Sequence, residues 1–392
     1  MEQIKSLHKA EYQHKADVVA VAPGRFHLIG EHTWFFRDKT LSMAVNLPVY
    51  VALSRKSDPS MNYYFVELKE RKKSSMVSMK MRKEDKWANA VKSVVYGFTA
   101  AGYEFKGGFD CTISSQILPS SGFGITTAIK VAAAWAIREL EHFEMTDEQL
   151  LHVLELANRK FLGTEFVKAD FYTAIFSKPG HLVLTDYGKN NCDLIPFEFE
   201  DKVVMLTDAS VPRITTWNEE SLQQPENVLL LGELKERKSN LYGGWRYEEN
   251  AAEINEVLSV VNEDTHRRLV CIMNEHKCVL DAEQALEKKD FASFAKAVKS
   301  SHESMRDLYD ISCPEIDWIL KRVQELDEKP DDLHTPVNCG RITGKGFGRC
   351  VYTVLRSSDV EKFKSKLAEY ERIFGFKSSS YIVQGAEGVH LL

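Results

Sequence analysis

The sequence has no long hydrophobic run and few of the residues that keep a chain unfolded. Its longest apolar run extends only from Val131 to Ile137, far below the roughly 20 residues that cross a bilayer. Glycine and proline, 21 and 11 of 392 residues, are too scarce for a collagen-like or low-complexity chain. The opening segment is polar and lacks the apolar core of a signal peptide. We therefore expect a globular protein that has no membrane partner.

A strong charge of either sign and paired cysteine motifs are also missing. The 51 basic and 57 acidic residues leave a net charge of −6, and a weakly acidic protein is poorly suited to coat nucleic acid or an anionic membrane. The seven cysteines are widely spaced and include no CxxC pair, which argues against a disulfide framework or a structural zinc site. We expect a cytoplasmic, monomeric protein with reduced thiols and no nucleic-acid partner.

Strand and helix patterns alternate along the whole chain. Strands are predicted over residues 17–22, 45–54, 75–82, 109–117, 180–186, 203–208, 347–355 and 380–384. Helices are predicted over residues 87–101, 125–142, 147–161 (with Thr146 as its N-cap) and 359–371, and in a helical region from about 245 to 325, which a polar loop at 330–337 follows. Because hairpin-like strands occur among these elements, an α+β fold with mixed sheets and helices fits better than a doubly wound parallel sheet.

A polar segment, residues 22–33, follows the first predicted strand. Its Arg25 can bind a negative group or lower the pKa of a neighbouring carboxylate. Glu31 and His32 can bind hydroxyl groups. The alternative is a turn with ordinary salt bridges, and the segment alone does not decide between the two.

A loop of glycine, serine and threonine at residues 120–127 leads into a predicted helix. Free backbone N–H groups at a helix N-terminus converge on one point and suit a phosphate. Thr126 or Thr127 can add a hydroxyl to a phosphate or to Mg²⁺. The Walker pattern GxxxxGK[ST] is absent here, so simple N-capping stays an alternative.

Two further segments are candidates for a site. Residues 341–350 contain Gly344, Gly346 and Gly348 ahead of a strand, which allows close backbone approach to a ligand but also suits a tight turn. Asp170 follows a predicted helix and can act as a base or as a helix cap. Lys168 would perturb Asp170 if the two side chains share a site.

Together and in this order, these segments resemble the GHMP small-molecule kinases, and within them the galactokinases. Residues 24–33 resemble the signature GRxNLIGEHT, and residues 87–92 resemble the helix motif WANYVK. Residues 301–317 are similar to SHxSLRDLYEVSCPELD, and residues 341–350 to RMTGGGFGGC. The likeness covers nearly the whole chain.

The resemblance implies a two-lobed α+β kinase with domains 1–205 and 206–392 and an active site between the lobes. It implies transfer of the γ-phosphate of MgATP to the anomeric hydroxyl of galactose or a related sugar. Asp170 falls on the catalytic aspartate and Arg25 on its arginine partner. The positions implied for the nucleotide are Trp87, Gly122, Phe123, Gly124, Ile125, Thr126 and Thr127, and those implied for the sugar are Glu31, His32 and Trp34.

Several of these positions depart from the family pattern. Trp34 stands where the family has an aspartate that binds sugar hydroxyls. Thr126 replaces a serine and Asn158 a glutamate at the two positions that meet Mg²⁺, so these are the metal-binding candidates. Lys130 and Lys168 add positive charge near the expected phosphates.

Two functions of different classes follow. The first is an active galactokinase-like sugar 1-kinase, which the surviving Arg25 and Asp170 favour. The second is a catalytically degenerate paralogue that binds sugar or nucleotide as a sensor or regulator, which Trp34 and Asn158 favour. A nucleic-acid-binding module that uses the basic stretch at residues 69–86 is disfavoured, because that stretch lacks interleaved aromatic residues.

Overall fold

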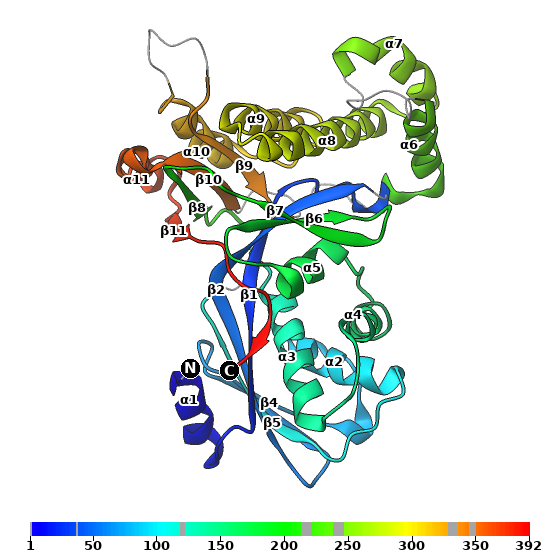
Figure 1. The fold of residues 1–392 in the computed structure, drawn as a ribbon, viewed down its shortest axis with the longest axis vertical. Helices are drawn as coiled ribbons and strands as arrows, with labels where there is room; N and C mark the ends of the chain where they lie inside the picture. The colour runs from blue at the N-terminus through cyan, green and yellow to red at the C-terminus, as the bar shows by residue number, and fades with distance from the viewer. Residues whose placement is uncertain are drawn as a thin grey trace. The chain divides into compact units, whose positions relative to one another are not determined.

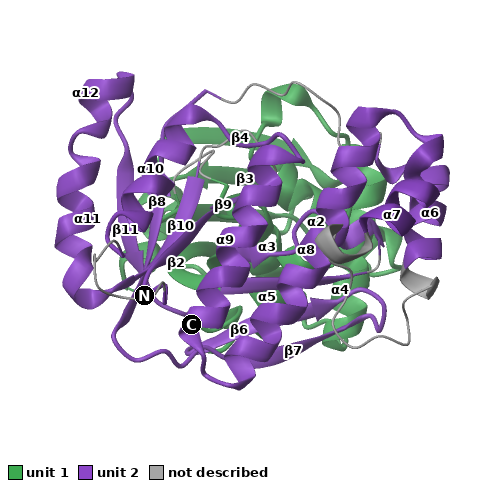
Figure 2. Ribbon diagram, turned by 90° about the horizontal axis from the view of Figure 1, so that it is seen from above, with its two compact units in different colours: residues 1–25, 44–178, 386–392 green, residues 26–43, 179–385 purple. Residues whose placement is uncertain are grey.

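The computed structural model describes residues 2–36, 38–117, 122–212, 222–237, 247–327, 335–344 and 350–392. These residues form two compact units, drawn in different colours in Figure 2. Unit 1 consists of Met1–Arg25, Ala44–Lys178 and Ala386–Leu392, and unit 2 of Phe26–Met43 and Pro179–Gly385. The domain boundary at residue 205 that the resemblance implies stays a prediction.

Unit 1 is built on a mixed sheet with the strand order β12-β1-β2-β5-β3-β4 (Figure 1). Strands β3 and β5 are parallel, whereas β2 and β5, β3 and β4, and β1 and β12 pair antiparallel. The strands are β1 (Val18–Ile29), β2 (Lys39–Arg55), β3 (Ser60–Phe65), β4 (Glu70–Ser75), β5 (Phe109–Ser115) and β12 (His390–Leu391). A mixed sheet agrees with the predicted α+β class.

Strand β1 is longer than the sequence pattern predicts. We expected it to end at Ala22, before the Pro-Gly pair, but it continues to Ile29. The reason is that the residues beyond the pair are apolar and buried, with Phe26 and Leu28 both 1% exposed. Gly24 fits into this run because it has no side chain: a Cβ there would lie 3.1 Å from the carbonyl oxygen of Leu47. The longer strand carries Arg25 in its interior.

The helices of unit 1 agree closely with the predicted ones. They are α1 (Glu2–Tyr12), α2 (Ala88–Ala100), α3 (Ile125–Glu141), α4 (Asp147–Leu156), a π-helical turn (Ala157–Leu162) and α5 (Lys168–Phe176). The predicted N-cap Thr146 is confirmed, since its side chain accepts from the N–H of Gln149 in a reciprocal capping box. Helices α1 and α5 were not predicted, and Asp170, which was expected to follow a helix, lies in the first turn of α5.

A buried histidine anchors helix α1. His8 is 0% exposed, with its Nε2 2.8 Å from Ser54 Oγ and its Nδ1 3.0 Å from Thr112 Oγ1. Burial, and to a smaller extent nearby His14, lowers the pKa of His8 to about 4, although Asp110 and Asp17 oppose the shift. His8 is therefore neutral in the folded chain where a solvated histidine would be protonated.

We expect α1 to detach more readily in acid. Between pH 4 and 6.5 the detached helix binds a proton at His8 that the packed helix does not, so the opening free energy falls as the pH falls, by about 1.4 kcal/mol per pH unit. Amide hydrogen exchange of α1, corrected for intrinsic rates, measures this slope. The slope should disappear in a His8→Gln variant; equal slopes in both proteins would contradict the assignment.

Unit 2 contains a second, antiparallel sheet with the order β11-β8-β10-β9. Its strands are β8 (Lys202–Asp208), β9 (Cys339–Thr343), β10 (Cys350–Arg356) and β11 (Ser379–Val383), and β6 (His181–Asp186) with β7 (Asn191–Pro196) forms a hairpin beside the start of β2. The helices are α6 (Pro225–Arg237), α7 (Tyr247–Val257), α8 (Glu263–Glu287), α9 (Phe291–Asp307), α10 (Pro314–Gln324), α11 (Val360–Leu367) and α12 (Tyr370–Phe374). One apolar core joins these helices to the sheet.

One predicted strand in unit 1 is wrong. Residues 75–82 alternate in polarity, yet β4 ends at Ser75 and a 3₁₀ turn covers Met76–Ser78. The Ser75 side chain accepts from the N–H of Val77, a local bond that competes with strand pairing. Val77 is 83% exposed, so no core holds the alternating pattern in place.

The cysteines, the lengths of the helices and the residues outside the described ranges also bear on the predictions. All seven cysteines are free thiols. None of the helices in the described ranges is long and apolar enough to span a membrane. Residues 330–334 of the polar loop predicted at 330–337, and the glycines Gly346 and Gly348, lie outside the described residues.

Candidate active site

Arg25 of β1 joins two predicted site segments within unit 1. Its Nη2 lies 2.8 Å from Oδ1 of Asp170, in the first turn of α5. Its Nη1 donates to the carbonyl oxygen of Gly122 at 3.1 Å, and its backbone N–H donates to that of Phe123 at 2.9 Å. The guanidinium of Arg25 therefore links the carboxylate of Asp170 to the glycine loop. The spacing of these residues in the sequence does not predict this contact.

The guanidinium of Arg25 is largely buried, and its Nε–H has no hydrogen-bond partner among the described residues. The side chains of Arg25 and Asp170 are 11% and 17% exposed. Arg25 Nε is buried and has no hydrogen-bond partner among the described residues. Because buried donors in native structures are normally paired, this N–H is available to a bound anion or hydroxyl.

The glycine loop leads into helix α3, whose first backbone N–H groups have no capping side chain. Gly122 and Gly124 have φ values of +83° and +80°, which favour glycine. Gly124 is the N-cap residue and no side chain caps the helix, so the N–H groups of Ile125 to Thr127 have no intrahelical acceptor. Thr126 is exposed, whereas Thr127 is 6% exposed. This arrangement suits a phosphate group.

Asn158, one of the two positions predicted to bind metal, accepts a hydrogen bond from a lysine. Asn158 lies in the π-helical turn after α4 and is 1% exposed. Its Oδ1 accepts a hydrogen bond from Nζ of Lys130, which is itself 5% exposed. An ammonium on the sole acceptor atom of an amide does not fit a divalent cation there. In the described ranges no cluster of His, Cys, Asp and Glu is arranged to hold a metal ion.

Trp87 has a structural environment of its own. It precedes α2, its indole N–H donates to Glu70 Oε2 at 2.9 Å, and its ring meets Phe65 edge-on at 5.3 Å. Among the described residues, this hydrogen bond and this ring contact do not reach the loop at 122–127. Its assignment to the nucleotide stays a prediction.

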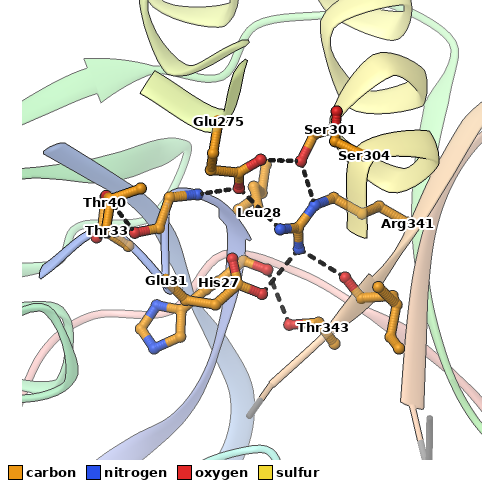
Figure 3. Close-up of polar contacts among 12 residues, drawn as sticks. His27, Leu28, Glu31, Thr33, Thr40, Glu275, Ser301, Ser304, Arg341 and Thr343 are labelled. Carbon is orange, nitrogen blue, oxygen red and sulfur yellow. Dashed lines mark hydrogen bonds and ion pairs between the residues drawn. The ribbon is translucent and has the colours of Figure 1, made fainter. Parts of the chain in front are cut away.

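Glu31 belongs to a buried charge cluster in unit 2 (Figure 3). Arg341 of β9 is fully buried; its Nη1 lies 2.7 Å from Glu31 Oε1 and its Nη2 lies 2.8 Å from Glu275 Oε1 on α8. Its Nε donates to Ser301 Oγ of α9 at 2.6 Å, and that hydroxyl donates to Glu275 Oε2 at 2.5 Å. Glu275 also accepts from the backbone N–H of Gly30 at 2.6 Å. Each of the three guanidinium nitrogens of Arg341 therefore has an acceptor among the described residues.

The second carboxylate oxygen of Glu31, Oε2, differs from Oε1 in that it has no hydrogen-bond partner among the described residues. The Glu31 side chain is 3% exposed, and Oε2 is buried without a hydrogen bond among the described residues. Burial would raise the pKa of Glu31, but the charge and hydrogen bond of Arg341, together with His32 and His27, outweigh burial and hold that pKa below its usual value. The same two carboxylates raise the pKa of Arg341 against its own burial. Glu31 is thus an ionised carboxylate with one acceptor atom left for a donor from outside.

The turn that carries Glu31 depends on a glycine. Gly30 has φ +93°, and a Cβ there would lie 2.3 Å from the carbonyl oxygen of Lys39. Its own carbonyl oxygen accepts from the hydroxyls of Thr33 and Thr40 at 2.9 and 2.7 Å. The signature around residue 30 is therefore a requirement of this tight turn as well as of a ligand.

The other two sugar candidates lie in the next turn of chain. His32 is 2% exposed and its ring lies 4.9 Å from that of Tyr309. Trp34 begins a 3₁₀ turn, Trp34–Phe36, and is half-buried. Asp38, four residues after Trp34, is buried, and its Oδ1 pairs with His276 Nδ1 at 2.6 Å.

The structure adds residues that the sequence did not single out for a site. Glu275 and His276 are adjacent on α8 and contact Gly30 and Asp38, respectively. Neither belongs to a motif with fixed spacing, so no sequence signal marked them. Ser301 stood only at the start of a resembling segment, and the structure gives its hydroxyl two buried charged partners.

Comparisons with known proteins agree with this geometry. The galactokinase galactose-binding signature matches residues 6–55, the GHMP kinase N-terminal domain residues 89–178, and the GHMP kinase C-terminal domain residues 282–372. The fold is also similar to that of a mevalonate kinase from Methanococcus jannaschii, with a TM-score of 0.63 and 16% identity over 94% of this chain and 98% of that one. The protein is therefore a member of the GHMP kinases.

Relatives narrow the class. A protein of Treponema pallidum (strain Nichols) named "Putative galactokinase" is 39% identical over all of this chain and 97% of its own length. A galactokinase of Thermotoga maritima is 29% identical over 94% of this chain and 98% of its own length. The structure of Lactococcus lactis galactokinase with galactose matches with a TM-score of 0.84 and 20% identity, over 100% of this chain and 99% of that one. The chain belongs to the galactokinase family.

Proposed function

We propose that the protein transfers the γ-phosphate of ATP to the anomeric hydroxyl of galactose. The observation that carries the proposal is the Arg25–Asp170 pair held against the glycine loop, in a chain that is 39% identical to a relative with a galactokinase name. Phosphoryl transfer by a kinase requires this pair, whereas binding of a ligand by a sensor does not. No described contact favours the catalytically degenerate alternative.

Asp170 is the proposed catalytic residue and Arg25 its partner. In the transfer, a bond forms between the anomeric oxygen and the γ-phosphorus, and the bond from that phosphorus to the β–γ bridging oxygen breaks, which releases ADP. The proton of the sugar hydroxyl passes to Asp170. Arg25 pairs with the carboxylate of Asp170, and its Nε–H donates to the negative charge that develops in the transfer.

The glycine loop is the proposed phosphate site. The N–H groups of residues 125–127 donate to phosphate oxygens, and the helix dipole of α3 favours their negative charge. Thr126 adds an exposed hydroxyl. Trp87 is the proposed contact for the base of the nucleotide. Mg²⁺ accompanies ATP in this proposal, but no step is assigned to a metal at Asn158, because Lys130 occupies its oxygen.

Glu31 and His32 are the proposed sugar contacts. The free Oε2 of Glu31 accepts from a sugar hydroxyl, which is the donor that its buried position lacks. We propose that the protein works in the cytoplasm as a monomer. The seven free thiols support the cytoplasmic setting.

Trp34 should loosen the choice of sugar. An indole stacks on the apolar face of a sugar but accepts no hydrogen bond, so we expect weaker discrimination among hydroxyl epimers than an aspartate would give. Trp34→Asp should increase the preference for galactose over its epimers by about 10-fold. A competition panel that compares kcat/KM values tests this, with Trp34→Phe as the control that keeps the apolar face. A strict galactose preference in the unaltered protein would contradict the idea.

The direct test of the proposed function is ³¹P NMR of the protein with MgATP and excess galactose. We expect the signal of an anomeric sugar phosphate to grow as that of ATP declines. No product from galactose at high enzyme concentration and long incubation would reject the proposal as stated.

A further inference from the structure

We infer that His276 of helix α8 is a positioning residue for sugar binding, because it holds, through Asp38, the turn that carries Glu31, His32 and Trp34. The inference rests on the proposed function in one respect, namely that these three residues contact the sugar. His276 itself is assigned no contact with the sugar.

Residues 30–36 together with Asp38 form what we call the sugar turn. Its internal hydrogen bonds are local. The backbone N–H groups of Thr33 and Phe36 donate to the carbonyl oxygens of Gly30 and Thr33 at 3.2 and 2.9 Å. Bonds of this kind fix the shape of a turn but not its orientation, so the orientation depends on contacts with the rest of unit 2.

Helix α8 contacts both ends of the sugar turn through two adjacent residues. At the first end, Glu275 Oε1 accepts from the backbone N–H of Gly30 at 2.6 Å. At the other end, His276 Nδ1 lies 2.6 Å from Asp38 Oδ1, and because an ionised carboxylate only accepts, the imidazole donates. The first end is secured a second time, since Glu275 also pairs with the buried Arg341. The second end depends more directly on one side chain, His276.

The Asp38 carboxylate has no hydrogen-bond partner other than His276 among the described residues. Asp38 is 2% exposed, and its Oδ2 is buried without a hydrogen bond. The main chain on the β2 side of Asp38 is held separately, because the Asp38 carbonyl oxygen accepts from the N–H of Tyr187 at 2.9 Å. A buried carboxylate that loses its donor is costly and moves toward water. Loss of the His276 donor should therefore displace the sugar turn before Asp38 rather than the strand after it.

The effect should be confined to the sugar. His276, Asp38 and the sugar turn all belong to unit 2, whereas Arg25, Asp170 and residues 122–127 belong to unit 1. The proposed phosphate site therefore shares none of the contacts that His276 makes. A change at His276 should alter the affinity for the sugar and leave the affinity for the nucleotide as it is.

The test measures binding of galactose, and separately of the non-hydrolysable ATP analogue AMPPNP, by calorimetry. His276→Phe keeps a ring but has no donor, and it should raise the Kd and KM for galactose by about 10-fold. The Kd for AMPPNP should stay unchanged, and kcat should change by less than about 3-fold. His276→Asn places an amide N–H near the position of Nδ1 and should bring the galactose Kd back to within about 3-fold of the original.

A second variant and a matched control sharpen the result. Asp38→Ala breaks the same contact from the side of the turn and removes the buried carboxylate, so it keeps the test open if His276→Phe does not fold. Asp38→Ala/His276→Phe should bind galactose no more weakly than the weaker-binding single variant, because both changes remove one interaction. Asp281→Asn removes a charge whose partner, Lys277, lies on α8 itself, and it should leave both Kd values unchanged. Thermal unfolding of each variant checks that it is folded.

The outcomes separate this inference from the proposed function. Galactose binding that weakens in His276→Phe and recovers in His276→Asn supports the inference even if no sugar phosphate forms in the NMR assay. An unchanged galactose Kd in His276→Phe, equal weakening of galactose and AMPPNP, or no recovery in His276→Asn overturns the inference even if galactose is phosphorylated. Absence of galactose binding by the unaltered protein overturns both.

Discussion

Replacing Asp170 by asparagine is expected to lower kcat for galactose phosphorylation by about 10³-fold. The substitution keeps the shape of the side chain but removes the group that takes the sugar proton. Because Arg25 retains its bond to the carbonyl oxygen of Gly122, the loop should keep its position. The affinity for AMPPNP should therefore remain nearly unchanged. Steady-state kinetics and calorimetry on the same preparation measure the two quantities.

Arg25→Lys is the informative companion variant. Arg25 binds Asp170 through Nη2 and Gly122 through Nη1, and a single ammonium does not reproduce this fork. We expect kcat to fall and the affinity for AMPPNP to fall with it, because the loop loses its link to the carboxylate. An Asp170→Asn variant that keeps more than a tenth of the original kcat would remove Asp170 from the mechanism.

The sequence predicted best those parts of the fold that depend on local pattern. Helix α3 begins at Ile125 and is one residue shorter than predicted, because a run of alanines at 132–134 and a glycine before the helix define both its face and its start. Strand β1 was predicted too short, because burial of Phe26 and Leu28 outweighs the turn signal of Pro23 and Gly24. Tertiary burial, which a local pattern does not contain, made the difference.

The residues of the candidate site also fall into two groups, those that a local sequence pattern predicts and those that depend on tertiary contacts. Arg25 and Glu31 could be singled out because they lie in a short segment with a recognisable order of residues, whereas Asp170 was assigned by its place in the family resemblance. Glu275 could not, because it is one acidic residue on a long helix whose burial depends on α9 and β9. The bond between Lys130 and Asn158 could not be predicted either, since 28 residues separate its ends.

Arg341→Met should be the most destabilising single substitution in the buried cluster of unit 2. It leaves Glu31 and Glu275, both buried, without a positive charge. Breaking a buried pair in this way costs about 3–5 kcal/mol, which corresponds to a fall in Tm of roughly 10 °C for a unit of this size. Thermal unfolding followed by circular dichroism measures the change. Lys364→Met, which removes an exposed ion pair with Glu361 in the same unit, should change Tm by less than about 2 °C.

The pH dependence distinguishes lost charge from lost packing. In the unaltered protein the pKa of Glu31 is below its usual value, so its contribution to stability is present above the unfolded pKa and lost only as the pH falls through the folded one. Without Arg341, burial raises that pKa above the unfolded value, and the folded chain then binds more protons than the unfolded chain. Arg341→Met should therefore gain stability between pH 7 and pH 5, relative to the unaltered protein. The double variant Arg341→Met/Glu275→Gln removes one of the two unpaired charges and should recover part of the lost Tm. A single variant whose deficit is the same at both pH values would show that packing, and not the charge of Glu31 and Glu275, determines the role of Arg341.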